Sequence, residues 1–260
     1  MAFADSKGTK IYYETHGEGP AIMFIHGSGG HHMAWYRQVA YLSRWYKIVT
    51  IDLRGFGNSD RVEGGPDSLD FTDDVEAVLD HAGLNRCALL GQSIGAAPAL
   101  RFAARSPQRV SGIILAHSTG GLSHPELGEK VKANRAEAEK IPVMDRLLTP
   151  EFRAGHPEMD FLFRQMGTFN HAGMRDLRNL SAQGPTVEEI NVTGVKLCFL
   201  AGERDAVLRP DTVRLAHKLV TTSVLRIAPN APHSFYWEMP DVFNAYVHDL
   251  LRIIYRETDV

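Results

Sequence analysis

The sequence predicts an α/β fold, in which a mostly parallel, twisted sheet of about eight strands carries helices on both faces. Two observations lead to this prediction. Short, almost uninterrupted apolar runs recur along the chain, and segments with the apolar period of a helix lie between them. Uninterrupted apolar runs are typical of strands buried on both faces, as in a parallel sheet covered by helices. The 260 residues, 44% of them hydrophobic, are enough for one large domain with a sizeable core.

The expected strands and helices alternate along the chain. Residues 8–16 have the mixed composition of an exposed antiparallel strand near a sheet edge. The buried strands expected after it are residues 21–25, 48–51, 87–90, 112–116, 195–201 and 223–227. The expected helices are residues 35–43, 70–81, 94–104, 211–220 and 240–255. Asp211 is placed to cap the first turn of the fourth of these helices.

One long stretch interrupts this alternation. Residues 120–185 contain no strand-like run but show helical segments at 129–139, 159–166 and 174–181. We interpret this stretch as a helical cap inserted after the sixth strand, and residues 1–119 and 186–260 as the core domain. We expect the cap to lie above the carboxyl ends of the strands, where it would exclude water from a reaction site.

Composition and charge limit the classes of partner. The chain has 28 Lys and Arg against 31 Asp and Glu, so nucleic acid and anionic membrane surfaces are not expected partners. No signal peptide is visible, and no apolar run approaches the roughly 18 residues of a membrane span. Cys87 and Cys198 lie within apolar runs, which predicts buried free thiols and a cytoplasmic protein. Nothing in the sequence indicates an oligomeric state or, among the 12 histidines, a metal site.

A candidate nucleophile lies in the pentapeptide Gly91-Gln92-Ser93-Ile94-Gly95, which follows a buried strand and precedes a helix. A serine on a tight strand-to-helix turn projects its hydroxyl above the sheet, and the turn leaves little room two positions before and after it. The helix N-terminus also places N–H groups and positive dipole beside the serine. The pattern favours Ser93 as a catalytic nucleophile.

The sequence resembles the α/β-hydrolase fold family over nearly its whole length. The family has an oxyanion-forming turn that begins His-Gly after its third strand, and residues 26–30 read His-Gly-Ser-Gly-Gly. It often has an Asp-x-x-Gly-x-Gly-x-Ser turn after its fourth strand, which matches residues 52–59. The nucleophile follows, and the family's cap occupies the place of residues 120–185. The resemblance implies a serine hydrolase with a helical cap, similar to carboxylesterases and lactonases.

The resemblance also implies the two partners of Ser93, because the family arranges nucleophile, acid and histidine in that order. Asp205 follows the strand at residues 195–201, and the place after the sixth strand, where some members carry the acid, has no carboxylate. His233 lies between the last strand and the C-terminal helix. We expect His233 to act as the base of Ser93, and Asp205 to orient His233 and stabilise its imidazolium.

The expected oxyanion hole uses two backbone N–H groups. One belongs to Ile94, directly after the nucleophile, and the other to Ser28 in the His-Gly turn, with Gly29 as the alternative donor. In the implied mechanism Ser93 attacks a carbonyl carbon, His233 transfers the proton, and water releases the acyl-enzyme. This chemistry calls for no cofactor and no metal.

The substrate is less constrained by the sequence. Apolar residues in the cap and after His233 indicate a pocket wall for a small molecule, a small or medium apolar ester or lactone. The expected substrate-binding residues are Gly29, Phe161, Phe163, Met166, Phe235 and Trp237, although packing of the cap onto the core also accounts for such residues. No cluster of Arg or Lys in the sequence indicates a phosphate or coenzyme A handle.

Two alternatives stay open. A carbon–carbon bond hydrolase of the meta-cleavage-product type is compatible with the cap and the Ser28-Gly29 turn. That group usually has Trp after the catalytic His and a Gly pair after the nucleophile, whereas this chain has Ser234 and Gly95-Ala96. The other alternative is a non-catalytic ligand receptor on the same fold. A complete set of catalytic residue types in the family's order argues against a receptor.

Overall fold

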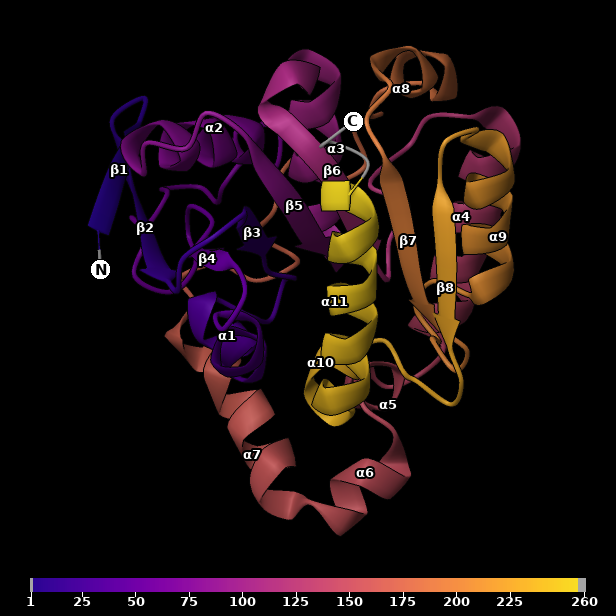
Figure 1. The fold of residues 1–260 in the computed structure, drawn as a ribbon. Helices are drawn as coiled ribbons and strands as arrows, with labels where there is room; N and C mark the ends of the chain where they lie inside the picture. The colour runs from indigo at the N-terminus through magenta and orange to yellow at the C-terminus, as the bar shows by residue number, and fades with distance from the viewer. Residues whose placement is uncertain (1, 257–260) are drawn as a thin grey trace.

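The computed structural model describes residues 2–256, which form an eight-stranded sheet with helices on both faces (Figure 1). The strands lie side by side in the order β1-β2-β4-β3-β5-β6-β7-β8. β2 pairs antiparallel with both β1 and β4, and all other neighbours are parallel. The strands are β1 (Ala2–Ser6), β2 (Thr9–His16), β3 (Ala21–Ile25), β4 (Lys47–Ile51), β5 (Cys87–Gln92), β6 (Val110–Ala116), β7 (Leu197–Gly202) and β8 (Val224–Ala228). The predicted fold class is confirmed.

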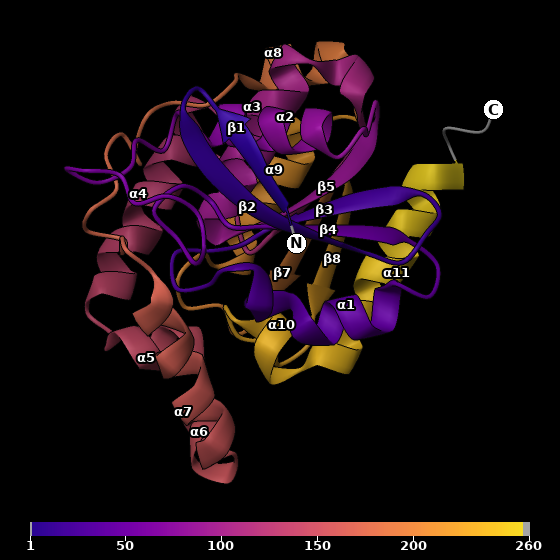
Figure 2. The ribbon, with the colours of Figure 1, turned by 90° about the vertical axis from the view of Figure 1, so that its left-hand side faces the viewer.

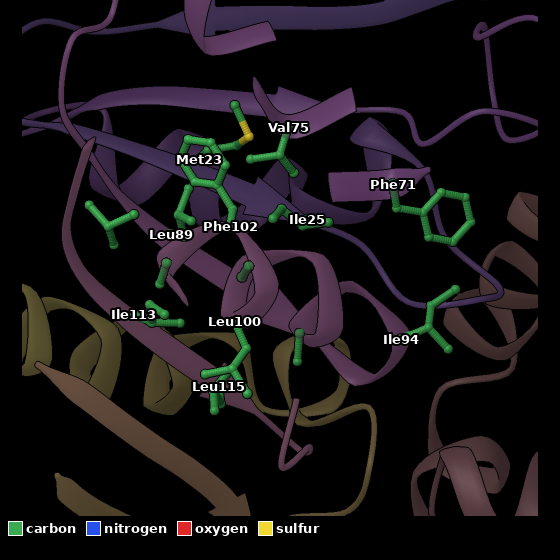
Figure 3. Close-up of a cluster of buried hydrophobic side chains, with 14 of the residues drawn as sticks. Met23, Ile25, Phe71, Val75, Leu89, Ile94, Leu100, Phe102, Ile113 and Leu115 are labelled. Atoms are coloured by element: carbon green, nitrogen blue, oxygen red, sulfur yellow. The ribbon is translucent and has the colours of Figure 1, made fainter. Parts of the chain in front are cut away.

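The helices form one layer on each face of the sheet (Figure 2). Because neighbouring side chains of a strand point to opposite faces, Ile22 and Phe24 of β3 belong to one core cluster while Met23 and Ile25 belong to the other. Figure 3 shows part of the second cluster, where Met23 and Ile25 lie among side chains of β5, β6, α2 and α3. The helices of the first layer are α1 (Tyr36–Leu42), α10 (Phe235–Glu238) and α11 (Pro240–Arg256), and those of the second are α2 (Phe71–His81), α3 (Ala96–Arg105), α8 (Val187–Thr193) and α9 (Pro210–Leu219).

The edge strand β1 was not predicted. It is short, and its Ala and Ser residues carry no strand signal of their own. It forms because the two-residue turn at Lys7 and Gly8, with φ of 54° and 84°, folds it back onto β2. Positive φ at both turn residues is typical of the tightest hairpins, whose backbone twist matches that of the strands.

The start of α9 also differs from the prediction. The helix begins at Pro210, so Asp211 lies inside the first turn and pairs with Lys130 at 2.8 Å instead of capping. The N–H of Arg209, the residue before the helix, donates to Oδ1 of Asn134 at 2.7 Å. Asn134 belongs to α4 (Pro125–Glu139), so the group that receives this N–H comes from a distant helix that local sequence does not indicate.

The insertion between β6 and β7 is helical, as predicted, and its helices are α4, α5 (Val143–Leu147), α6 (Pro150–Gly155) and α7 (Pro157–Met166). α5, α6 and α7 lie on the side toward which the arrows of β7 and β8 point, and α6 and α7 project from the rest of the molecule (Figures 1 and 2). The prediction missed α5 and α6, both of which begin beside a proline. Proline favours the first turn of a helix and opposes the continuation of the preceding one.

Residues 174–181 are not helical, and this prediction is wrong. Their backbone bonds to a distant loop instead. The N–H of Arg178 donates to the carbonyl of Pro66, and the N–H of Ser68 donates to the carbonyl of Arg178, each at 3.0 Å. Long-range pairing of this kind overrides a local helical pattern.

The turn from β5 into α3 packs closely against other backbone. A Cβ on Gly91 would lie 2.3 Å from the carbonyl oxygen of Gly95, and a Cβ on Gly95 would lie 2.4 Å from the carbonyl oxygen of Ile25 at the end of β3. Ser93 between them has a φ of 52°, a strained conformation for a residue other than glycine. The turn continues through the short 3₁₀ helix η2 (Ser93–Gly95).

His26, the first residue after β3, fixes the neighbouring turn. Its Nδ1 lies 2.8 Å from the carbonyl oxygen of Gly27, and its Nε2 lies 3.0 Å from the backbone nitrogen of Leu53. Because a backbone N–H can only donate, Nε2 accepts and Nδ1 carries the hydrogen, which makes the ring neutral. Burial lowers the pKa of His26 to about 4. The neutral ring therefore joins the turn after β3 to the turn after β4.

Cys87 of β5 and Cys198 of β7 are buried thiols and not part of a disulfide, as predicted. β6 lies between their strands, which places the two thiols too far apart for a disulfide. Over residues 2–256, no helix has both the length and the apolar character needed to cross a bilayer.

We predict that Gly95→Ala destabilises the protein by about 3 kcal/mol, because its Cβ would meet backbone atoms that cannot move aside. The matched control is Gly128→Ala in α4, where a Cβ has no neighbour within 4 Å and should stabilise the helix by about 1 kcal/mol. Urea unfolding of the three proteins measures both effects. Equal stability of Gly95→Ala and the wild type would contradict the close packing.

The neutral, buried state of His26 predicts a pH-dependent stability. Its pKa is about 4 in the folded protein against 6.5 for a free histidine, so its contribution is complete above pH 6.5 and is lost as the pH falls toward 4. The loss is on the order of 3 kcal/mol. Urea unfolding between pH 7.5 and 4.5 should show a smaller decline for His26→Gln than for the wild type. The control His156→Gln, at an exposed site of the insertion, should retain the wild-type decline.

Candidate active site

The candidate nucleophile Ser93 lies at the carboxyl end of β5, on the strained turn described above. Its side chain is partly exposed and lines a pocket of about 710 Å³. Ile94, the next residue, lies in the first turn of η2, where N–H groups have no acceptor within the helix. Ser28 and Gly29, from the turn that His26 fixes, line the same pocket. The arrangement brings both expected oxyanion segments to the side of Ser93.

Asp205 and His233 form a buried pair next to this pocket. Nδ1 of His233 lies 3.0 and 2.9 Å from the two carboxylate oxygens of Asp205, and each residue is only 3% exposed. Asp205 Oδ1 also accepts the N–H groups of Val207 at 2.8 Å and Leu208 at 2.9 Å, which fix the carboxylate in its turn. His233 itself lines the pocket together with Ser93. The three residues predicted from the family order are thereby brought to one place, from turns after β5, β7 and β8.

A second histidine shares the carboxylate. Nδ1 of His117, the residue after β6, lies 3.0 Å from Asp205 Oδ2. His117 is 1% exposed and has a positive φ of 55°, and its ring lies 5.4 Å from the ring of His233. His117 also lines the pocket, and the sequence does not predict its bond to Asp205.

These contacts keep Asp205 ionised. Burial by itself would raise the pKa of Asp205, but the charge on His233 and the hydrogen bonds from His117 and His233 hold this pKa well below its ordinary value. Burial lowers the pKa of His117, so that ring is neutral and donates its Nδ1 hydrogen to the carboxylate. The carboxylate therefore remains an acceptor for His233 at all physiological pH values.

Two groups of residues have the types and proximity of a metal site. In the described residues, potential ligand atoms lie within 4.8 Å of one another in His31, His32 and Asp52, and in His117, Asp205 and His233. Internal hydrogen bonds account for the proximity of His32 to Asp52 and of both histidines to Asp205. Asp52 accepts from the backbone and Nδ1 of His32, at 2.5 and 2.9 Å, as Asp205 accepts from its two histidines. The first group lies outside the pocket lining and ties the His-Gly turn to the Asp52 turn.

The pocket is lined by both the core and the insertion. Core residues include Ser93, His117 and His233, and the insertion contributes side chains from α4, α5 and α7. The residues of the insertion that line it are Gly121, Val131, Arg135, Ala138, Glu139, Val143, Arg146, Leu147, Phe163, Met174, Arg175, Leu180 and Ala182. A smaller hollow of about 330 Å³, at the opposite edge of the sheet, contains none of the candidate catalytic residues.

The expected substrate-binding residues divide into two sets. Gly29 and Phe163 line the pocket. Phe161 does not, because residues two apart on a helix point about 200° apart, and Phe161 is 63% exposed on the far side of α7 from Phe163. Met166 is buried in the core cluster beneath α1, α10 and α11, and its assignment to the pocket is a correction as well.

Phe235 and Trp237 also lie outside the pocket. Phe235 is fully buried and packs on Phe243 with ring centroids 5.2 Å apart, while Trp237 packs on Phe163 at 5.4 Å. Tyr236, the residue between them, turns the other way and lines the pocket. The sequence indicates an aromatic segment after His233 but not which of its rings faces the pocket, because the orientation of the four-residue helix α10 depends on its packing.

Four arginines in the pocket lining were missed. Arg101 comes from α3, Arg135 from α4, Arg146 from α5 and Arg175 from the connection between α7 and α8. They are far apart in the sequence, so no local cluster indicates that the fold gathers them. The sequence shows no cluster of Arg or Lys that would indicate a phosphate or coenzyme A handle, but the fold brings these four arginines into the lining of one pocket.

Comparison with known proteins places the chain in a family. Residues 20–240 match the model of the alpha/beta hydrolase fold. A pimeloyl-[acyl-carrier protein] methyl ester esterase from Aliivibrio fischeri is 39% identical over 111 residues, which is 43% of this chain and only 41% of that protein, so the chain matches less than half of its length. A thermophilic esterase from Thermogutta terrifontis superposes with a TM-score of 0.83 at 23% identity, over 97% of this chain and 98% of that one.

An enol-lactonase from Burkholderia xenovorans has a similar structure, with a TM-score of 0.78 at 23% identity over 96% of this chain and 99% of that one. At such identities the two structures are evidence for the fold alone. The match of the family model extends over most of the chain, from before β3 to the start of α11. This protein therefore belongs to the α/β-hydrolase fold family.

Proposed function

We propose that the protein is a serine hydrolase that cleaves carboxylic esters or lactones of small molecules through an acyl-enzyme. One observation carries the proposal. The buried Asp205–His233 pair and Ser93, on a turn with a φ of 52°, line or border one pocket at the carboxyl ends of the strands. Backbone strain, a buried ionised carboxylate and a histidine at one place are features that enzymes concentrate at reaction centres.

The proposed reaction begins at Ser93. Its hydroxyl oxygen attacks the carbonyl carbon, and Nε2 of His233 accepts the hydroxyl proton as the new bond forms. Asp205 holds Nδ1 of His233 as a donor and stabilises the imidazolium that results. The same proton then passes to the leaving alkoxide, and His233 next activates the water that releases the acid.

Negative charge on the tetrahedral intermediate would be stabilised by the backbone N–H groups of Ile94 and Ser28, with Gly29 as the alternative to Ser28. The neutral His26 ring and the close contact between the ends of β3 and β5 hold the two segments that carry these groups. A rigid pair of donors is worth about 3 kcal/mol for each donor in reactions of this type.

The insertion, residues 120–185, would act as the cap of the site, and residues 1–119 and 186–260 as the catalytic core. The N–H of Ser234, next to His233, donates to the carbonyl of Leu147 in α5 at 2.9 Å. Glu238 of α10 accepts from the N–H of Thr149 at 2.9 Å and from its hydroxyl at 2.7 Å. These hydrogen bonds connect the segment around His233 to the insertion, so the insertion would help to hold His233 in place.

Support for ester chemistry comes from the relative that is 39% identical over 111 residues, which is a methyl ester esterase. The apolar lining from Val131, Leu147, Phe163, Leu180 and Leu208 suits the hydrocarbon part of such a substrate. The carbon–carbon hydrolase stays open as the alternative, because meta-cleavage product hydrolases also superpose on this chain, with TM-scores of 0.75 and 0.77 at 20% identity.

A fluorophosphonate probe tests the nucleophile. The wild type should be labelled covalently and Ser93→Ala should not, whereas Ser118→Ala, which removes another hydroxyl of the same pocket, should be labelled. Turnover of p-nitrophenyl acetate should fall by several orders of magnitude in Ser93→Ala and by about 10⁴ in Asp205→Asn. Absence of labelling in the folded wild type would favour a receptor over an enzyme.

The pocket wall predicts chain-length specificity. Phe163→Ala should shift the preference among p-nitrophenyl esters toward longer acyl chains, because it removes a ring that lines the pocket. Phe161→Ala, two residues away and 63% exposed, should leave the preference unchanged. Profiles from acetate to decanoate, taken well below the melting temperature of each variant, measure the shift. Identical profiles for both variants would mean that Phe163 only packs on Trp237.

A further inference from the structure

The charge of the pocket is strongly asymmetric. Four guanidinium groups, those of Arg101, Arg135, Arg146 and Arg175, line it, and Glu139 is the one carboxylate among the described lining residues. Arg101 and Arg146 are partly buried, while Arg135, Arg175 and Glu139 are exposed at the rim. The remaining titratable residues of the lining are His117 and His233. An excess of fixed positive charge therefore surrounds a pocket that otherwise has an apolar wall.

These arginines differ from the structural arginines of the same chain. Arg54 is buried and bonds to Asp74 and Asp70, and Arg105 pairs with Asp73 and Glu76. Within residues 2–256, no carboxylate forms an ion pair with any of the four pocket arginines. Nη2 of Arg101 donates to the carbonyl of Ala182 at 2.9 Å, and Nη1 of Arg135 donates to the hydroxyl of Ser181 at 3.1 Å.

Arg146 is the least satisfied of the set. Its Nε is buried and has no hydrogen-bond partner among the described residues. Burial lowers the pKa of Arg101, and the charge of Asp67 offsets only part of this effect. A buried guanidinium without a counter-charge is unfavourable unless something else supplies one. The planar fork of donors on a guanidinium binds carboxylate and phosphate oxygens with two parallel hydrogen bonds.

The position of Arg146 relates these charges to the candidate catalytic groups. It is followed by Leu147, whose carbonyl accepts the N–H of Ser234 beside His233. Arg101 lies on α3, the helix that begins directly after the turn of Ser93. The segment of Arg146 therefore contacts the residue beside His233, and the helix of Arg101 continues from the turn that carries Ser93.

We propose that the substrate is an ester or lactone that carries a second, anionic group, a carboxylate or a phosphate, which Arg146 and Arg101 bind while Ser93 attacks the ester carbonyl. The inference rests on the proposed function and narrows its substrate class. Arg135 and Arg175, at the exposed rim, would attract the anion on entry, and the apolar wall would contact the hydrocarbon between the two ends of the substrate.

Two methyl esters test the proposal in turnover. Methyl hexanoate and monomethyl adipate have the same chain length and differ in a terminal methyl against a carboxylate. For the wild type, kcat/KM measured from the release of methanol should be at least about 10-fold higher for monomethyl adipate than for methyl hexanoate. Arg146→Gln and Arg101→Gln should remove this preference, mainly through a higher KM for monomethyl adipate.

The matched control is Arg164→Gln, an arginine of α7 that pairs with Asp160 at 2.9 Å and lies outside the pocket lining. It should retain the wild-type preference. Arg101→Gln loses the bond to Ala182, so Arg135→Gln at the exposed rim is the second variant if Arg101→Gln fails to fold. Arg135→Gln should weaken the preference for monomethyl adipate, and the effect of this substitution should depend more strongly on salt concentration. An equal kcat/KM for the two esters in the wild type would overturn the proposal.

A binding measurement separates this inference from the proposed function. Calorimetry with the Ser93→Ala variant compares adipate, butyl phosphate and 1-hexanol, and the tighter of the two anions identifies the group that is recognised. At least one anion should bind about 10-fold more tightly than the alcohol, and added Arg146→Gln should abolish the difference. Binding of the anion without any ester turnover or probe labelling would reject the hydrolase and retain the anion site. Turnover of neutral esters without anion binding would reject the anion site alone.

Discussion

The close contact between the end of β3 and the turn after β5 is the constraint on which the site depends. Only glycine at positions 91 and 95 allows the backbone of the turn to lie against itself and against the carbonyl of Ile25. That contact holds Ser93 at its positive φ and sets the His-Gly turn beside it. Since both segments are backbone, their relative position cannot relax as side chains do. Packing of the main chain thereby places Ser93 beside the two segments that carry the proposed oxyanion donors before any substrate binds.

The buried carboxylate of Asp205 is the second feature on which the site depends, and it accepts more hydrogen bonds than the one from His233 alone. Two backbone N–H groups and two imidazoles donate to one buried carboxylate. His117 and His233 come from the turns after β6 and β8, so the carboxylate ties together three neighbouring strand ends. Buried networks in which every acceptor is satisfied are rigid, and loss of one member leaves the others unpaired. The orientation of His233 therefore depends on His117 as well as on Asp205.

Local sequence predicts features that depend on local chemistry. Apolar runs locate six of the eight strands, because a strand buried on both faces must be apolar along its length. The mixed composition of residues 8–16 locates β2. The glycine spacing locates the turn of Ser93, and the family's order locates Asp205 and His233. What local sequence does not predict depends on distant partners. Examples are Asn134 at the start of α9, the pairing of Arg178 with the loop at Pro66, and the side of α7 that faces inward. The four pocket arginines belong to this second class.

The two classes correspond to two parts of the proposed active site. The reactive groups lie on turns at the ends of core strands, where the main chain fixes them. The groups that would recognise a substrate lie mostly on the insertion, which joins the core near the base through Leu147 and Thr149. The charge of the partly buried Arg146 acts in a lower dielectric than charges at the surface, so it has a larger effect there. Under the proposed function, changes in the insertion would therefore alter which ester is bound without altering how the ester is cleaved.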